Sequence, residues 1–217
     1  MLMKSQSRFE ELFQMKKKAL MPYLCFGYPD IEESKKIAKT MLENGADALE
    51  MGFPFSDPVA DGPLLTAANN TALNQKIGLD NLFAFVKEIR NSGFEQPITL
   101  MSYYNIVLNF MHRDFTGKFK RSGLDALLIP DIPFEEAKNQ EMQFKGVKRA
   151  FLVGLNTPLE TVKKISCLKP EYIYLVAKFG VTGVDKKLNP QVSKRLEEVR
   201  DYSRLQVAVG FGISSKK

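Results

Sequence analysis

Histidine is almost absent from this chain, because His112 is the single histidine among its 217 residues. A catalytic triad that uses histidine, or a metal site with several histidines, would therefore depend on His112 itself. The surrounding residues, Asn109 to Phe115, are typical of a helix surface. Acid–base chemistry is expected instead from carboxylates, tyrosines, lysines or cysteines.

Cysteine and long apolar runs are scarce as well. Cys25 and Cys167 lie in apolar stretches without the spacing of a zinc site, so we predict two packed thiols and no metal site. No apolar run approaches the roughly 18–20 residues that cross a bilayer, and the N-terminal segment lacks the apolar core of a signal peptide. We therefore expect a cytoplasmic protein.

The composition is that of a globular protein, with 44% hydrophobic and 26% charged residues. The net charge of +6 is diffuse, and its densest runs, at 16–18 and 216–217, carry no interleaved aromatic residues. This pattern argues against a nucleic-acid platform. An anionic small substrate accounts for mild basicity equally well.

Apolar runs of strand length alternate with amphipathic runs of helix length along almost the whole chain. Near-continuous apolar runs are typical of parallel strands that are covered on both faces. The seven predicted strands are 20–26, 48–53, 98–103, 126–132, 150–154, 172–177 and 207–211.

Helix boundaries follow from capping residues between these runs. Asp30 with Glu33 predicts a helix start, and Gly45 predicts its end. Thr157-Pro158 and Asn189-Pro190 each predict a cap followed by proline at the first helical position.

Repeated strand–helix units either close into a (βα)₈ barrel or spread into a doubly wound sheet. No G-x-G-x-x-G motif follows the first strand, and each unit spans only about 25–30 residues. We therefore predict an α/β fold of the TIM-barrel class, with residues 1–217 forming a single barrel domain.

Glu50 is the first candidate catalytic residue. Alternation along 48–53 places Leu49, Met51 and Phe53 toward the helices, so Glu50 points into the barrel near the carboxyl end of its strand. Burial should raise the pKa of Glu50, which suits a general acid or base. The alternative is an ion pair inside the barrel, for example with a lysine.

The segments after the strands add further candidates at the same rim. The loop 54–63 is rich in turn-forming residues and carries Asp57 and Asp61, which individually are compatible with a purely structural role. Glu50 and Asp61 together suggest a carboxylate pair. The glycine-rich segments 178–183 and 210–214 offer backbone N–H groups of the kind that bind phosphate late in a barrel.

The run from Gly45 to Pro63, GADALEMGFPFSDPVADGP, resembles the signature of the tryptophan synthase alpha subunit family. The resemblance extends from about Phe9 to Ser214. The further segments in register are Pro22-Tyr23, 102–105, 130–133, 180–183 and 210–214.

The resemblance implies retro-aldol cleavage of indole-3-glycerol phosphate to indole and glyceraldehyde 3-phosphate in tryptophan biosynthesis. It implies no cofactor in this subunit, and a partner beta subunit with pyridoxal phosphate in a heterotetramer of two alpha and two beta subunits. By the same resemblance Glu50 transfers protons and Asp61 holds the indole N–H.

The family pattern also matches residues of three further kinds. Indole-pocket positions, which could instead be simple barrel filling, are Tyr23, Met101, Tyr103 and Tyr174. Phosphate positions are Thr182, Gly183 and Gly212, and rim positions that face the beta subunit are Asp57, Pro58 and Pro133.

Complete family members continue through an eighth strand, so we expect a barrel truncated after the seventh strand and incomplete at the C-terminus. Two alternatives to an active lyase stay open. One is a catalytically impaired subunit that only binds or modulates the beta subunit. The other is another phosphate-binding barrel, such as an isomerase in which Glu50 abstracts a proton next to a carbonyl, although the Asp61 loop and the single histidine argue against it.

Overall fold

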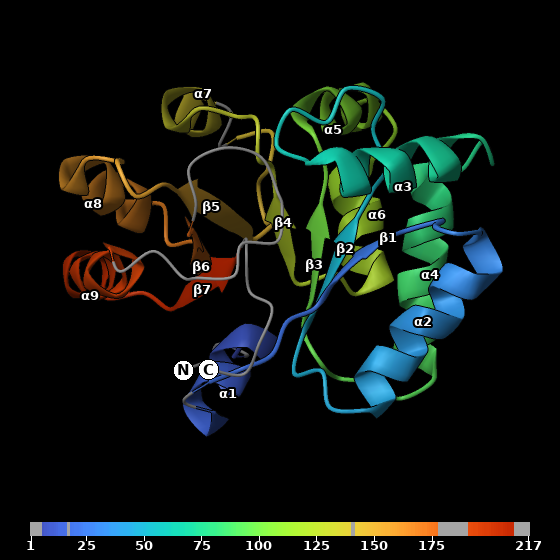
Figure 1. The fold of residues 1–217 in the computed structure, drawn as a ribbon, viewed down its shortest axis with the longest axis horizontal. Helices are drawn as coiled ribbons and strands as arrows, with labels where there is room; N and C mark the ends of the chain where they lie inside the picture. Colours follow the sequence, from blue (N-terminus) through green and yellow to red (C-terminus); the bar gives the residue numbers. More distant parts are fainter. Residues whose placement is uncertain (1–5, 17, 140–141, 178–190, 211–217) are drawn as a thin grey trace.

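Seven parallel strands form one sheet in chain order, as the computed structural model shows (Figure 1). The structure describes residues 6–16, 18–139, 142–177 and 191–210. Every predicted strand is confirmed, although most are shorter than the apolar runs. The strands are β1 Tyr23–Cys25, β2 Leu49–Gly52, β3 Ile98–Met101, β4 Ala126–Leu128, β5 Arg149–Val153, β6 Tyr172–Val176 and β7 Val207–Gly210.

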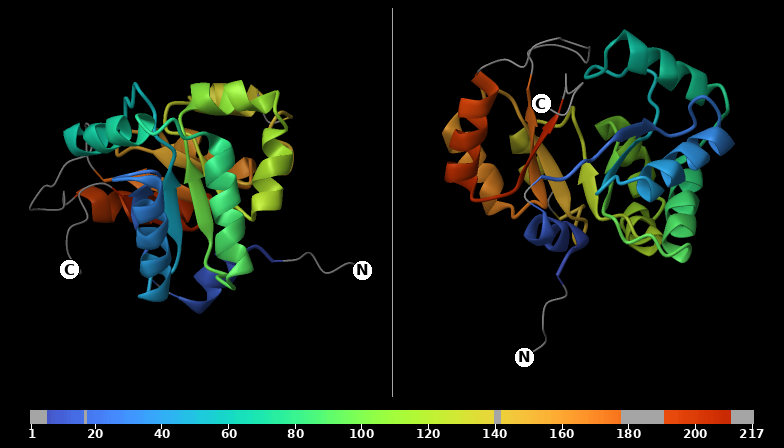
Figure 2. Two further views of the ribbon diagram at one scale, coloured as in Figure 1. Left: turned by 90° about the vertical axis from the view of Figure 1, so that its right-hand side faces the viewer. Right: turned by 60° about the horizontal axis from the view of Figure 1, so that its bottom comes forward.

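Helices cover the outer face of this curved sheet (Figures 1 and 2). In Figure 1, α2 and α4 lie beside β1–β3, and α8 and α9 lie beside β5–β7. The helices are α1 Arg8–Met15, α2 Ile31–Glu43, α3 Pro63–Leu73, α4 Leu79–Asn91, α5 Tyr104–Met111, α6 Phe115–Ser122, α7 Phe134–Asn139, α8 Leu159–Cys167 and α9 Gln191–Ser203.

The sheet is open between its first and last strands within the described residues. There, β1 pairs only with β2, and β7 pairs only with β6. The strand–helix repeat and the chain-order topology are those of the TIM-barrel class, as predicted.

The capping predictions were partly right. Asp30 caps α2 by accepting a hydrogen bond from the Glu33 N–H at 2.9 Å, and Gly45 follows the helix with φ +101°. Thr157 was assigned wrongly. Helix α8 begins at Leu159, with Pro158 in the cap position, while the Thr157 hydroxyl accepts from the Gly154 N–H and closes the preceding turn. The predicted start at 189–190 lies outside the described residues.

Buried hydrophobic side chains pack on both faces of the sheet. On the outer face, one cluster joins Leu49, Met51 and Phe53 to the helices, which confirms the direction predicted for these side chains, and another joins β5 and β6 to α8 and α9. The inner cluster lies inside the barrel and includes Phe9 and Tyr172, whose ring centroids are 5.0 Å apart. Helix α1 therefore packs against the barrel interior at the amino ends of the strands.

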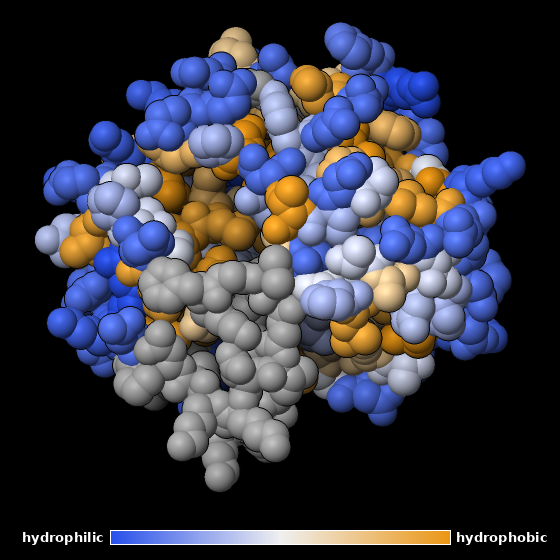
Figure 3. All heavy atoms as spheres, turned by 45° about the horizontal axis from the view of Figure 1, so that its top comes forward, coloured by the Kyte–Doolittle hydropathy of each residue, from blue (hydrophilic) through white to orange (hydrophobic). Residues whose placement is uncertain are grey.

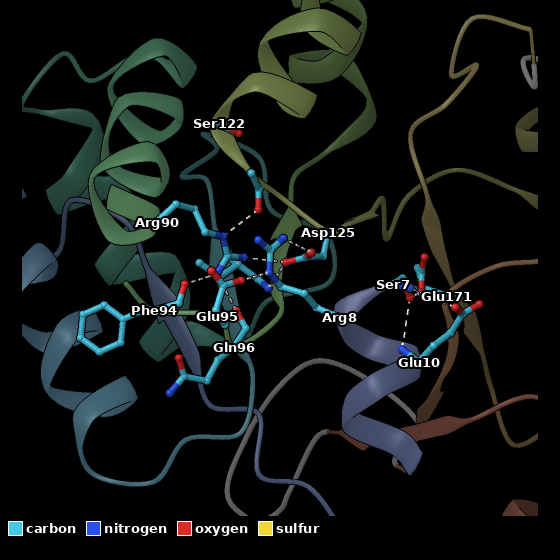
Figure 4. A network of polar contacts seen from close by, with 12 residues as sticks. Ser7, Arg8, Glu10, Arg90, Phe94, Glu95, Gln96, Ser122, Asp125 and Glu171 are labelled. Carbon is cyan, nitrogen blue, oxygen red and sulfur yellow. Dashed lines mark hydrogen bonds and ion pairs between the residues drawn. The ribbon is translucent and has the colours of Figure 1, made fainter. Parts of the chain in front are cut away.

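A polar network fastens α1 to the amino ends of β3 and β4 (Figure 4). Arg8 on α1 forms ion pairs with Glu95 at 2.7 Å and with Asp125 at 3.1 Å. Asp125 also pairs with Arg90 at 2.7 Å and accepts a hydrogen bond from the Ile98 N–H. The side chains of Asp125 and Arg90 are only 8% and 11% exposed, so their charges depend on each other.

The predictions for the two cysteines and for His112 had different outcomes. Cys25 is buried, but Cys167 is exposed, so the prediction of a packed thiol was wrong there. Cys167 is the last residue of α8, and its side chain faces solvent rather than the sheet. His112 is exposed at the end of α5, as predicted.

Within the described part of the chain, no helix combines the length and the apolar character that a membrane crossing requires.

Candidate active site

Glu50 lies on β2 between Tyr23 of β1 and Thr99 of β3 in the parallel register. Glu50 is 5% exposed. Its side chain lines a cavity and does not point toward the helices. The alternation-based prediction for Glu50 is therefore confirmed. Because β2 is hydrogen-bonded to β1 on one side and to β3 on the other, the backbone that carries this carboxyl group is held in place.

Burial raises the pKa of Glu50 to about 7, and the nearby Asp61 charge acts in the same direction. Among the described residues, no lysine or arginine forms an ion pair with Glu50. The described part of the structure thus gives no support to the alternative of a structural salt bridge. A carboxyl group with this pKa exchanges protons readily at neutral pH.

Asp61 lies at the end of the loop after β2, immediately before α3. Its backbone N–H donates to the Pro58 carbonyl at 3.0 Å, which closes the turn. Its side chain accepts a hydrogen bond from Asn69 Nδ2 at 2.9 Å. Burial raises the pKa of Asp61, while the polar groups of Asn69 and Tyr103 act in the opposite direction.

Both carboxyl groups line one cavity of about 150 Å³ at the carboxyl ends of the strands. Figure 3 looks onto this end of the molecule and shows hydrophobic side chains gathered around a hollow in the face. A mostly apolar wall with a few polar groups is typical of a small-molecule site. The lining residues are Tyr23, Glu50, Asp61, Leu65, Met101, Leu128, Pro130, Leu152 and Tyr174.

Five of the predicted residues thus meet at this cavity, and four lining residues were not singled out from the sequence. Leu128 and Leu152 could have been found from strand alternation, since both face the barrel interior. Pro130 lies in the loop after β4, where no periodic pattern indicates direction, and Leu65 lies in the first turn of α3.

Tyr103 lies behind the cavity wall rather than on it. It is 1% exposed, and its hydroxyl accepts a hydrogen bond from the Ala60 N–H at 3.1 Å. Its ring stacks on Phe55 with centroids 4.9 Å apart. Tyr103 therefore supports the loop that carries Asp61.

Tyr23 and Tyr174 flank Glu50 with neutral hydroxyl groups. Burial raises the pKa of Tyr23 and of Tyr174, and the negative charge of Glu50 adds to both shifts. Both side chains therefore keep their protons at neutral pH and can donate hydrogen bonds in the cavity.

The remaining predicted residues lie at the rim or outside the described residues. Asp57 and Pro133 are exposed, and Pro58 is half-buried beside Val59, which is 72% exposed. The predicted phosphate residues Thr182, Gly183 and Gly212 lie outside the described residues. Within the described part, no three histidine, cysteine, aspartate or glutamate side chains are grouped to bind a metal ion.

Comparison with known proteins identifies the family. The family model described as "Tryptophan synthase alpha chain" matches residues 9–217. This chain belongs to the tryptophan synthase alpha chain family. The function predicted from the sequence, a carbon–carbon lyase subunit of tryptophan biosynthesis, is confirmed at the level of the family, and the alternatives are not favoured.

Curated relatives carry the same name. The tryptophan synthase alpha chain of Aquifex aeolicus is 38% identical over 97% of this chain and 81% of its own length. The tryptophan synthase alpha chain of Prochlorococcus marinus strain NATL1A is 36% identical over 96% of this chain and 79% of its own length. The chain thus spans about four fifths of these relatives.

Solved structures agree with the fold. A chain of Mycobacterium tuberculosis tryptophan synthase superimposes with a TM-score of 0.88 at 28% identity, covering 97% of this chain and 82% of that one. A chain from a structure of the tryptophan synthase complex of two alpha and two beta subunits from Pyrococcus furiosus gives 0.82 at 35% identity, covering 91% and 80%.

Proposed function

We propose that this chain cleaves indole-3-glycerol phosphate with Glu50 as the proton-transfer residue and Asp61 as the acceptor for the indole N–H. The observation that carries the proposal is the meeting of Glu50 and Asp61 in one small, mostly apolar cavity. An apolar wall suits an indole ring, and two carboxyl groups suit a reaction that moves protons.

Glu50 is assigned the first proton transfer. With its pKa near 7, a large fraction of Glu50 is protonated at neutral pH and can protonate indole C3. The bond from C3 to the glycerol chain then breaks, and its electron pair restores the aromatic ring. The Glu50 carboxylate accepts the proton of the adjacent hydroxyl as the aldehyde forms, which returns Glu50 to its starting state.

Asp61 stabilises the charge that develops on the ring during this step. Protonation at C3 leaves positive charge at the indole nitrogen, and a carboxylate that accepts the N–H stabilises that charge. Asp61 lines the cavity and is only 8% exposed, so its charge acts with little screening by water.

The cavity wall holds the ring between aromatic and aliphatic groups. Tyr23, Met101 and Tyr174 lie on this wall, and their side chains fit a flat heteroaromatic substrate. Thr182, Gly183 and Gly212 remain our assignment for the phosphate group. The chemistry needs no cofactor in this subunit.

The exposed rim is our candidate surface for the beta subunit, which would hold pyridoxal phosphate. We assign Asp57, Pro58 and Pro133 to this surface. Next to it lie Val59 and Leu64, which are 72% and 80% exposed and add apolar area. Exposed aliphatic side chains beside polar rim residues are typical of a protein interface. The relative from P. furiosus supports a heterotetramer, and a cytoplasmic location stays a prediction.

The test is the release of glyceraldehyde 3-phosphate and indole from indole-3-glycerol phosphate, measured with the beta subunit present. We expect equal amounts of both products from the wild type and a loss of about 10²–10⁴-fold in kcat for Glu50→Gln. Glu43→Gln, an exposed carboxylate at the end of α2, is the matched control and should be unaffected. A folded wild-type chain that releases no product would overturn the proposal.

A further inference from the structure

A buried polar chain leads away from Asp61 into the layer between α3 and β1. Asn69, on α3, is 2% exposed and donates from Nδ2 to Asp61 Oδ2 at 2.9 Å. Its Oδ1 accepts a hydrogen bond from the Cys25 thiol at an Sγ···Oδ1 distance of 3.5 Å. The role proposed for Asp61 does not by itself require either hydrogen bond.

The chemistry of the two ends sets the orientation of the amide in the middle. A carboxylate only accepts hydrogen bonds, whereas a protonated thiol can donate one. Burial raises the pKa of the Cys25 thiol to about 12, so the proton stays on sulfur at neutral pH. The Asn69 carbonyl therefore faces Cys25, and its NH₂ group faces Asp61.

We propose that Asn69 is a positioning residue for the cleavage reaction. It holds Asp61 through Oδ2, so that the carboxylate keeps its direction toward the substrate N–H in the cavity, while the Cys25 thiol keeps the Asn69 amide in the required orientation. The proposal rests on the proposed function of Asp61. It adds two residues that do not line the cavity, Asn69 and Cys25, to the groups on which turnover depends.

The loss of this hydrogen bond should be costly, because both partners are buried and one is charged. Asn69→Ala removes the Nδ2 donor from Asp61 Oδ2 and leaves Asp61 with the polar group of Tyr103 alone. We expect kcat/KM to fall about 10- to 100-fold, with kcat affected more than KM because the ring charge develops only in the transition state. Asn70→Ala, the adjacent exposed asparagine, is the matched control and should stay within about twofold of the wild type.

A double-mutant cycle separates positioning from general support of the fold. The cycle combines Asn69→Ala with Asp61→Ala and measures the Kd of an uncleavable substrate analogue, indole-3-propanol phosphate. We expect Asn69→Ala to weaken analogue binding when Asp61 is present and to change it less than twofold when Asp61 is absent. Equal losses in both backgrounds would assign Asn69 a structural role and overturn the proposal.

Cys25 provides a second approach that leaves Asn69 in place. Cys25→Ala removes the donor that orients the amide and should lower kcat/KM several-fold, whereas Cys25→Ser keeps a donor and should lose less. Equal values for the two variants would contradict the orienting role. The analogue cycle needs no turnover, so a chain that fails to cleave substrate would reject the proposed function without deciding the coupling between Asn69 and Asp61.

Discussion

The hydroxyl oxygen of Tyr23 occupies the space that a β-carbon on Gly52 would need. The two residues lie on neighbouring strands, and the ring of Tyr23 crosses over the Gly52 backbone beside Glu50. Tyr174 has the same relationship to Gly210 on β7. Glycine at these positions therefore gives two cavity-lining tyrosines their places.

Substitution Gly52→Ala should displace Tyr23, because the new methyl group overlaps the phenol oxygen and ring. Overpacking of this kind costs about 1–3 kcal/mol of unfolding free energy. We expect that cost in urea unfolding, together with a fall of at least about 10-fold in kcat/KM.

Gly78→Ala provides the control, because a β-carbon there would meet only Asn81 Oδ1 at 3.8 Å. It should change kcat/KM by less than twofold. Wild-type kinetics for Gly52→Ala would show that the position of Tyr23 is unimportant for the reaction.

The activity should depend on the protonation of Glu50. Since Glu50 is assigned the role of initial acid and burial raises its pKa to about 7, kcat/KM should fall as the pH rises through about 7. This descending limb should disappear in the residual activity of Glu50→Gln. A descending limb that persists in that variant would assign the titration to another group.

The raised pKa of Glu50 should also make the free energy of unfolding depend on pH. Between pH 4.5 and about 7, folded Glu50 keeps a proton that the unfolded chain has released, so its burial lowers stability as the pH rises. Glu50→Gln removes this penalty. We expect the variant to gain up to about 3 kcal/mol over the wild type at pH 8 and little at pH 4.5, measured by urea unfolding. A variant less stable than the wild type at pH 8 would contradict the burial argument.

The network at the amino ends of the strands makes a separate prediction about stability. Asp125→Ala leaves Arg90 and Arg8 without their shared buried carboxylate and should cost about 3–5 kcal/mol. Glu95 is the other partner of Arg8, and the Glu95 side chain is 73% exposed. Glu95→Ala should therefore cost less than about 1 kcal/mol. Thermal unfolding of both variants checks the contrast, and similar losses would contradict it.

Most of the fold could be predicted from the sequence, because buried parallel strands leave near-continuous apolar runs. The run at 126–132 overestimates β4, since apolar residues continue into the following loop, where Pro130 lines the cavity. The start of α8 was placed wrongly because Thr157 bonds back to Gly154 instead of capping the helix. Side-chain hydrogen bonds of this kind depend on local geometry that the sequence does not display.

The candidate site was predictable in part. Strand alternation was enough to direct Glu50 into the barrel, and the burial that alters its pKa follows from that direction. Tyr103 could not be distinguished from a wall residue, because its position behind the Asp61 loop depends on packing against Phe55. Asn69 gave no signal, since an asparagine in a helix is usually exposed.

The most direct test of the account is the fate of indole-3-glycerol phosphate bound to Glu50→Gln. The substrate would be titrated into the variant with the beta subunit present, and the same sample would then be analysed for indole and glyceraldehyde 3-phosphate. We predict binding with a Kd within a few-fold of that for the uncleavable analogue on the wild type, and recovery of the substrate intact. Release of both products at the wild-type rate would contradict the role of Glu50.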